Sequence, residues 1–325
     1  MPLPASLQGR LKIPAIASPM FLASGPDLVV ETCKGGMIGT FPALNQRTTE
    51  GYAAWLEEIA SRLDGVEGAA PFGINLIVHR SNSRVEADLA KTVEHKVPLV
   101  ITSLGAVKDV VDAVHSYGGL VFHDVINARH AEKAAAAGVD GIIAVACGAG
   151  GHAGTLNPFA LISEIRSVWS GTLVLAGAIN TGAQVLAARA MGADMAYLGT
   201  RFLATQEATI EPDFKNMIVE SDASDILYTP AISGVNANFL KPSIIRAGLD
   251  PDNLPQAGKM NLEHEAKAWK TVWSAGQGAG GIHDILPAGD LVARLIREYG
   301  EILEGVRSGD PDRARRAAWN HLLRT

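Results

Sequence analysis

The chain has 325 residues, of which 47% are hydrophobic and 19% charged, and this composition is sufficient for the core of a large folded domain. Acidic residues outnumber basic ones by 34 to 28 and no Lys/Arg cluster is present, which disfavours binding to nucleic acid or to anionic membranes. No stretch reaches the roughly 20 unbroken apolar residues of a spanning helix, the first residues lack a signal-peptide pattern, and Cys33 and Cys147 are the only cysteines, so we expect a cytoplasmic protein without disulfides.

Short apolar runs rich in Val, Ile and Leu recur along the chain, and a helix-like segment follows each of them. A strand that is apolar on both faces is typical of a parallel sheet covered by helices, because a sheet with one wet face alternates polar and apolar residues. Eight runs fit this description, at residues 15–20, 36–41, 71–76, 98–104, 119–125, 141–147, 172–178 and 195–200.

The segments between the runs carry helix-end signals. Asn127 can cap a helix that Gly138 ends, and a second helix over Thr181 to Met191 stops at Gly192. Strand starts are about 26 residues apart and eight units fill about 200 residues, the size of a (β/α)8 or TIM barrel. The alternative is an open doubly wound sheet, which usually has fewer strands.

The repeat stops after the eighth strand. We interpret residues 214–272 as an inserted small, mainly helical substrate subdomain or lid. Residues 287–321 hold two amphipathic helical patterns broken by the sequence SGDPD, which we expect to pack back on the barrel. The predicted division is therefore a barrel with C-terminal helices over 1–213 and 273–325, and a subdomain over 214–272.

In such barrels the active site lies at the carboxyl ends of the strands, so the residues that close each apolar run are the candidates. Because side chains alternate along a strand, either His123 or Asp124 points into the barrel, and not both. The candidates are Met20, Asn75, His123, Asp124, the loop at 147–154, the loop at 177–182, and Gly199 with Thr200 and Arg201.

The loops after the seventh and eighth strands occupy the positions at which TIM barrels commonly bind phosphate. Gly177, Ala178, Gly199 and Thr200 can supply backbone N–H donors beside a helix start. The alternative is that the glycines only permit tight turns. Two such loops at the expected positions favour phosphate.

The loop GAGGHAG carries His152 among residues too small to cover it. Its unperturbed pKa near 6.5 suits a general base or a hydrogen-bond donor, and the alternative is a structural histidine. A metal site would need His123, Asp124 and His152 to converge, but no HxH or HExxH spacing supports one, so we expect no metal. Cys147 is interpreted as a packing residue, and no GxSxG motif indicates a serine hydrolase.

The motifs resemble those of FMN-dependent nitronate monooxygenases, formerly called 2-nitropropane dioxygenases, and of the related FMN-dependent enoyl-ACP reductases. The matching motifs, in order, are SPM at 18–20, PFGIN at 71–75, GLVFHDV at 119–125 with the helix and strand that follow, AGGHAG at 149–154, LAGAINTG at 175–182, MGADMAYLGTRFLAT at 191–205 and WSAGQG at 273–278.

The resemblance implies a TIM barrel with an inserted substrate domain that binds FMN. The phosphate would lie at the loops after strands seven and eight, and the flavin ring near Met20, Asn75 and the backbone of Gly150 and Gly151. His152 matches the family histidine that faces the substrate. The implied reaction is oxidation of alkyl nitronates by flavin and O2 to a carbonyl compound and nitrite.

Three positions depart from the family pattern. Many relatives have a Lys where this chain has Asp124, a Glu where it has Gly148, and GGI where it has Gly177, Ala178 and Ile179. A Lys near the flavin would stabilise the reduced, anionic flavin, whereas an Asp would not. This departure therefore affects the reduction potential of the flavin and the choice of electron donor. Gln277 either reaches the flavin or forms a structural turn.

The sequence is compatible with several functions. An NAD(P)H-dependent FMN reductase of quinones or enoyl thioesters is the alternative within flavin chemistry, although no nicotinamide motif is present. A flavin-free isomerase or aldolase would use the same phosphate loops, but it normally needs a Lys or paired carboxylates. A non-catalytic flavin binder is disfavoured by His152. The expected partners are a small-molecule nitronate and O2, without nucleic acid or membrane, and a homodimer is the candidate assembly.

Overall fold

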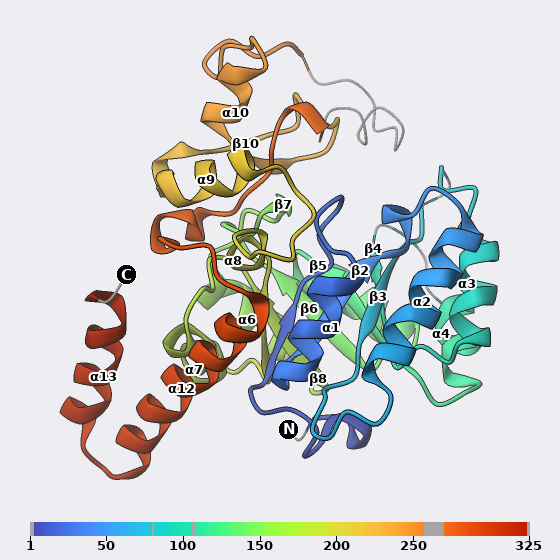
Figure 1. Cartoon of the computed structure of the whole chain (residues 1–325), viewed down its shortest axis with the longest axis horizontal. Helices are drawn as coiled ribbons and strands as arrows, with labels where there is room; N and C mark the ends of the chain where they lie inside the picture. Colours follow the sequence, from blue (N-terminus) through green and yellow to red (C-terminus); the bar gives the residue numbers. More distant parts are fainter. Residues whose placement is uncertain (1–2, 80, 104, 106–107, 257–269, 324–325) are drawn as a thin grey trace.

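The computed structural model describes residues 3–79, 81–103, 105, 108–256 and 270–323, and its centre is a closed barrel of eight parallel strands (Figure 1). Neighbouring strands pair in the order β1-β2-β3-β4-β5-β6-β8-β9. Each of the eight predicted apolar runs overlaps one of these strands, so the TIM barrel prediction is confirmed. The strands are β1 (Ala15–Ala17), β2 (Ile38–Pro42), β3 (Gly73–Ile77), β4 (Leu99–Ser103), β5 (Leu120–Val125), β6 (Gly141–Val145), β8 (Thr172–Ala176) and β9 (Met195–Leu198).

Helices connect the strands and cover the outside of the barrel. The predicted N-cap is confirmed, because Asn127 Oδ1 accepts from the amide of His130 at 2.9 Å. At the predicted start of the second helix, Thr181 forms a capping box with Gln184. The helices are α1 (Pro26–Gly35), α2 (Thr49–Leu63), α3 (Val85–Glu94), α4 (Lys108–His115), α5 (Ala128–Ala136), α6 (Pro158–Val168), α7 (Gly182–Ala190) and α8 (Thr200–Leu203), with short 3-10 helices at η1 (Ala5–Leu7) and η2 (Ala43–Asn45).

Large apolar side chains fill the barrel interior. They form one cluster, separate from the cluster between the strands and the outer helices. Side chains alternate along each strand, so every second residue of a strand points into the barrel. The fully buried members on the strands are Ile16, Ile38, Leu99, Ile101, Phe122, Ile143, Val174 and Met195.

The inserted region contains helices and also a small sheet that the sequence analysis did not predict. Its helices are α9 (Pro212–Glu220), η3 (Ala223–Asp225) and α10 (Lys241–Arg246). Strands β10 (Ile226–Thr229) and β11 (Ala237–Leu240) are antiparallel, and β11 also pairs with β7 (Gly151–His152), which belongs to a barrel loop. Helix α9 runs across the predicted boundary at residue 214. Residues 257–269 of the predicted subdomain lie outside the described residues.

The C-terminal part begins with η4 (Gln277–Gly281) and continues as two helices, α12 (Ala288–Arg307) and α13 (Pro311–Leu323). Their separation at the sequence SGDPD confirms the prediction. Helix α12 packs on α1 and α7, as expected, whereas α13 packs on α12 and lies away from the barrel (Figure 1). Gly305 permits this contact, because a Cβ there would lie 2.7 Å from the amide nitrogen of Ala314. Over the described residues, no helix is long and apolar enough to cross a membrane.

Candidate active site at the carboxyl ends of the strands

Two neighbouring residues of β5 point to opposite sides of the barrel wall. His123 Nδ1 lies 2.8 Å from the hydroxyl of Thr102, whereas Asp124 Oδ2 accepts a 2.5 Å hydrogen bond from the hydroxyl of Ser103. Phe122 belongs to the interior cluster, so alternation places Asp124 inside the barrel and His123 outside. Burial lowers the pKa of His123 to about 4.

Asp124 ends a chain of polar groups that crosses three strands. The amide Nδ2 of Asn75 donates to the carbonyl oxygen of Ile101 at 3.1 Å and to the hydroxyl of Ser103 at 2.9 Å, and Ser103 in turn donates to Asp124. Both hydrogens of the Asn75 amide are used in this way, so its carbonyl oxygen remains for another partner. The chain fixes the orientation of Asn75 and of Asp124 at the barrel mouth.

Burial raises the pKa of the Asp124 carboxyl to about 6, and the Ser103 hydroxyl and the nearby His152 oppose this shift. The second carboxyl oxygen, Oδ1, is buried and has no hydrogen-bond partner among the described residues. Tyr197 on β9 lies close by. Its pKa is raised well above the ordinary value, first by burial and then by the negative charge of Asp124.

His152 reaches the barrel mouth on a loop that the insert holds in place. Its strand β7 pairs with β11, with His152 opposite Ala237. Asn238 Nδ2 donates to the carbonyl oxygen of Ala149 at 2.7 Å, and the amide of Gly151 donates to Ser274 Oγ at 2.7 Å. Ser274 donates onward to the carbonyl oxygen of Asn238 at 2.6 Å. The position of His152 therefore depends on residues more than 80 positions away in the sequence.

The two predicted phosphate loops follow the neighbouring strands β8 and β9. Gly177 (φ +128°) and Ala178 (φ +53°) have left-handed backbone conformations, which turn the chain sharply after β8. The amides of Gly177, Ala178, Gly199 and Thr200 donate to no group in the part of the chain that the structure describes. Unpaired amides at adjacent strand ends form the donor set that a phosphate group requires.

One feature of these loops differs from the expectation. The first helical amide of α7, that of Gly182, donates to the buried carboxylate of Glu298 at 2.8 Å. A carboxylate is a favourable partner for a helix N-terminus, so this position is already satisfied. A bound anion would therefore accept hydrogen bonds from the loop amides that precede α7, and not from the first amide of that helix.

The segment before and within η4 contacts both phosphate loops and the His152 loop. The amide of Gly276 donates to Thr200 Oγ1 at 2.8 Å, and the amide of Gln277 donates to the carbonyl oxygen of Gly148 at 3.0 Å. A Cβ on Gly148 would lie 3.0 Å from Gln277 Oε1. The Glu of the family pattern would therefore be in tight contact with the side chain of Gln277. Gln277 begins η4, and its exposed side chain lies beside Gly148.

Close backbone approach also explains two glycines of the predicted site. A Cβ at Gly199 would lie 2.8 Å from the hydroxyl of Ser18, and a Cβ at Gly150 would lie 3.0 Å from the amide nitrogen of Gly276. Met20 follows β1 and its backbone is fixed by hydrogen bonds with Ser24 and Asn45. No hydrogen bond or ion pair of the described residues joins Met20 to the other predicted groups.

The structure does not bring His123 together with Asp124 and His152. Among the described residues, no group of three or more His, Cys, Asp and Glu side chains is arranged to hold a metal ion. Cys33 is buried, Cys147 is partly buried, and both are free thiols.

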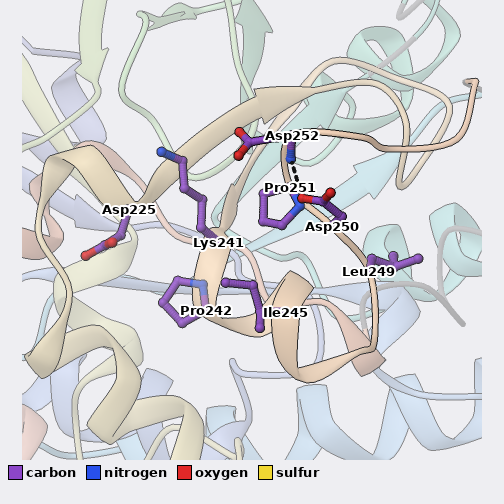
Figure 2. A pocket seen from close by; sticks show the side chains of 8 residues that line it. All are labelled: Asp225, Lys241, Pro242, Ile245, Leu249, Asp250, Pro251 and Asp252. Carbon is purple, nitrogen blue, oxygen red and sulfur yellow. Dashed lines mark hydrogen bonds between the residues drawn. The ribbon is translucent and has the colours of Figure 1, made fainter.

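A separate pocket of about 470 Å³ lies in the insert, at α10 and the residues after it (Figure 2). The amide of Asp252 donates to Asp250 Oδ1 at 3.0 Å. The lining residues are Asp225, Lys241, Pro242, Ile245, Leu249, Asp250, Pro251 and Asp252. None of them closes a barrel strand, so this pocket is separate from the site at the barrel mouth.

Comparison with known proteins identifies the family of this chain. The family model for nitronate monooxygenase matches residues 80–298, about two thirds of the chain. The chain belongs to the nitronate monooxygenase family. It is therefore an enzyme of a family of flavin-dependent oxidoreductases, and this match confirms the resemblance found in the motifs.

Relatives of this nitronate monooxygenase family member match nearly the whole chain. A nitronate monooxygenase of Paraburkholderia phytofirmans is 29% identical, and the match covers 90% of this chain and 94% of the relative. The solved structure of nitroalkane oxidase from Streptomyces ansochromogenes has a TM-score of 0.79 at 25% identity, over 93% of this chain and 100% of that one. FabK from Thermotoga maritima has the same fold, with a TM-score of 0.77 at 24% identity over 93% and 97% of the two chains.

Sequence reasoning missed several residues of the site. Ser103 closes the fourth apolar run and Tyr197 lies two residues before Gly199 in the eighth, so the strand-end criterion could have found both. Asn238, Ser274 and Glu298 act from distant segments, and no local pattern marks them.

Proposed function

We propose that this protein oxidises alkyl nitronates with bound FMN and O2 to a carbonyl compound and nitrite. The observation that carries the proposal is the position of His152, which the insert fixes beside a barrel mouth whose neighbouring loops present unpaired amides. Membership of the nitronate monooxygenase family supports it.

The residues at the mouth fit an FMN group. The four unpaired amides of Gly177, Ala178, Gly199 and Thr200 would bind its phosphate. The carbonyl oxygen of Asn75 and the close backbone of Gly150 offer polar contacts for the ring. When bound, FMN supplies the electron acceptor, and O2 is the final oxidant.

The protein's own contribution is binding, orientation and electrostatics. His152 would donate a hydrogen bond to the nitro oxygens of an anionic nitronate. With a neutral nitroalkane it would take the proton from the carbon next to the nitro group. The backbone pairing of β7 with β11 limits the movement of His152, which favours one orientation toward the substrate.

The decisive experiment is anaerobic reduction of the purified protein. We expect a yellow protein whose flavin absorbance is bleached rapidly by propyl-2-nitronate, and slowly or not at all by NADH and NADPH. Admission of air should then yield acetone and nitrite. A colourless protein would contradict the proposal, and bleaching by NAD(P)H alone would favour a reductase of quinones or enoyl thioesters.

His152→Asn tests the assigned role. We expect FMN to remain bound and kcat/KM for neutral nitroalkanes to fall about 100-fold or more, the range that a general base contributes. His130→Asn, on the exposed face of α5, is the matched control and should leave the rate unchanged. Unchanged turnover by His152→Asn would remove the catalytic role of this residue.

A further inference from the structure

Asp124 is a partly buried residue at the barrel mouth, and only one of its two carboxyl oxygens has a hydrogen-bond partner among the described residues. Oδ2 accepts from Ser103, and Oδ1 is buried with no hydrogen-bond partner among the described residues. An ionised carboxylate accepts hydrogen bonds at both oxygens, whereas the acid form has one O–H to donate. A buried carboxylate oxygen without a donor is unfavourable, so the site favours the acid form.

The groups that face Asp124 from the surrounding elements provide little positive charge. The hydroxyl of Ser103 on β4 and the amide of Asn75 on β3 are neutral, and Ile143 is opposite Asp124 on β6. The titratable groups are His152 from the β7 loop and Tyr197 on β9. No Lys or Arg forms an ion pair with Asp124 within the described ranges.

The charge of the substrate also favours the acid form of Asp124. A nitronate carries one negative charge, and an ionised Asp124 in the same partly dehydrated mouth would repel it. A protonated Asp124 would remove this repulsion. The unused oxygen and the charge of the substrate therefore require the same protonation state.

We propose that anionic substrates bind while Asp124 is in its carboxylic acid form, so that, when Asp124 is ionised in the free protein, binding of each anion takes up one proton, which Asp124 holds on Oδ1. The identification of the anion as a nitronate rests on the proposed function. Asp124 then controls the affinity for the anion through its charge, whereas His152 would contact the substrate. Asp124 performs this role at a position where the family pattern has a Lys, which would attract an anion by charge alone.

The affinity for the anion should therefore fall as the pH rises. Burial holds the pKa of Asp124 near 6 in the free protein, so at higher pH most molecules must bind a proton before they bind the anion. The apparent dissociation constant should rise about tenfold between pH 7 and pH 8, and less steeply below pH 6. Tyr197 stays neutral throughout this range because its pKa is raised.

Butyrate is a suitable probe, because its carboxylate has the shape and charge of 1-propyl nitronate but does not transfer electrons. Isothermal titration calorimetry at pH 7.5, in two buffers with different ionisation enthalpies, gives the number of protons taken up. We expect about one proton per butyrate for the wild-type holoprotein. Asp124→Asn should lose this uptake and show a dissociation constant that is nearly constant from pH 6.5 to pH 8.

The nature of the test variant and two control variants make the test specific. Asn at position 124 can still accept from Ser103, so the polar chain is kept, and the flavin spectrum reports that the site is intact. Asp112→Asn, the same substitution at an exposed position of α4, should bind butyrate like the wild type. His152→Asn should still take up a proton, because the proton on Asp124 does not come from His152.

The outcomes separate this proposal from the proposed function. Proton uptake that persists in Asp124→Asn, or wild-type binding of butyrate without proton uptake, would overturn the role of Asp124. Failure of the wild type to bind butyrate at pH 6 would also overturn it, because the acid form is then abundant. Nitronate oxidation is measured independently by flavin bleaching and nitrite, so either proposal can fail while the other stands.

Discussion

The barrel interior has two layers of opposite character. The layer toward the amino ends of the strands is filled by fully buried apolar side chains such as Ile101, Phe122 and Met195. The layer above it, at the carboxyl ends, contains Ser103, Asp124 and Tyr197. Residues two positions apart on the same strand thus belong to different environments.

The difference shows how one sheet serves stability and function at once. Each buried Ile or Phe contributes about 1.5–3 kcal/mol relative to its exposed state. The upper layer lacks this contribution and holds groups whose pKa values burial has shifted, which is typical of functional sites. The separation is a general property of TIM barrels, whose active sites lie at the carboxyl ends of the strands.

The largest expected effect comes from breaking the apolar layer. Phe122→Ala should lower the free energy of unfolding by about 3–5 kcal/mol, because the loss of a buried ring leaves a cavity in the barrel. Urea denaturation measures this change. Phe122→Leu, which preserves more volume, should cost less than half as much, and equal costs would contradict a tightly packed layer.

Asp124→Asn probes the upper layer through pH. The folded pKa of about 6 lies above the unfolded value near 3.9, so ionisation of Asp124 opposes folding as the pH rises from about 4 to above 6. The Asp124→Asn variant has no ionisable group at this position, so it does not lose stability in this way. Its stability relative to the wild type should therefore increase by about 2 kcal/mol between pH 4.5 and pH 7.5, measured by denaturation at each pH. A difference that does not change with pH would contradict the burial of an ionisable Asp124.

Asn238→Ala tests the support of the His152 loop above this layer. Loss of the hydrogen bond to the carbonyl oxygen of Ala149 should cost about 1–2 kcal/mol of stability, because that oxygen loses its side-chain partner. It should also lower kcat/KM without changing the flavin content. Asn253→Ala, at an exposed position of the insert, should change stability by less than about 0.5 kcal/mol. An equal effect of the two variants would show that the loop does not depend on Asn238.

Ala178→Gly should give the smallest effect, and a favourable one. Ala178 has φ +53°, a conformation that is unfavourable for residues with a Cβ and readily adopted by Gly. We expect stabilisation by about 0.5–1 kcal/mol in thermal or urea denaturation. Ala183→Gly in α7 is the matched control and should destabilise by about 0.5–1 kcal/mol. Destabilisation by Ala178→Gly would mean that the Cβ of Ala178 makes a favourable contact.

The lower layer was easier to predict than the upper one. Its strands appear in the sequence as continuous apolar runs, and the helix ends at Asn127, Gly138 and Thr181 follow from local capping chemistry. In the upper layer the strand-end criterion found Asn75 and Asp124 but left the choice between His123 and Asp124 open. That choice depends on the phase of β5 relative to its neighbours, which no single strand specifies.

The sequence by itself determined the eight strands, the helix caps, the barrel class and the loop that carries His152, because these depend on residues close together in the chain. Only the tertiary structure decided that Asp124 faces the interior beside Ser103, that Glu298 occupies the start of α7, and that Asn238 and Ser274 fasten the His152 loop. These contacts join segments 21 to 123 residues apart. Their partners are set by strand register and by the packing of the insert, and local patterns in the sequence contain no record of either.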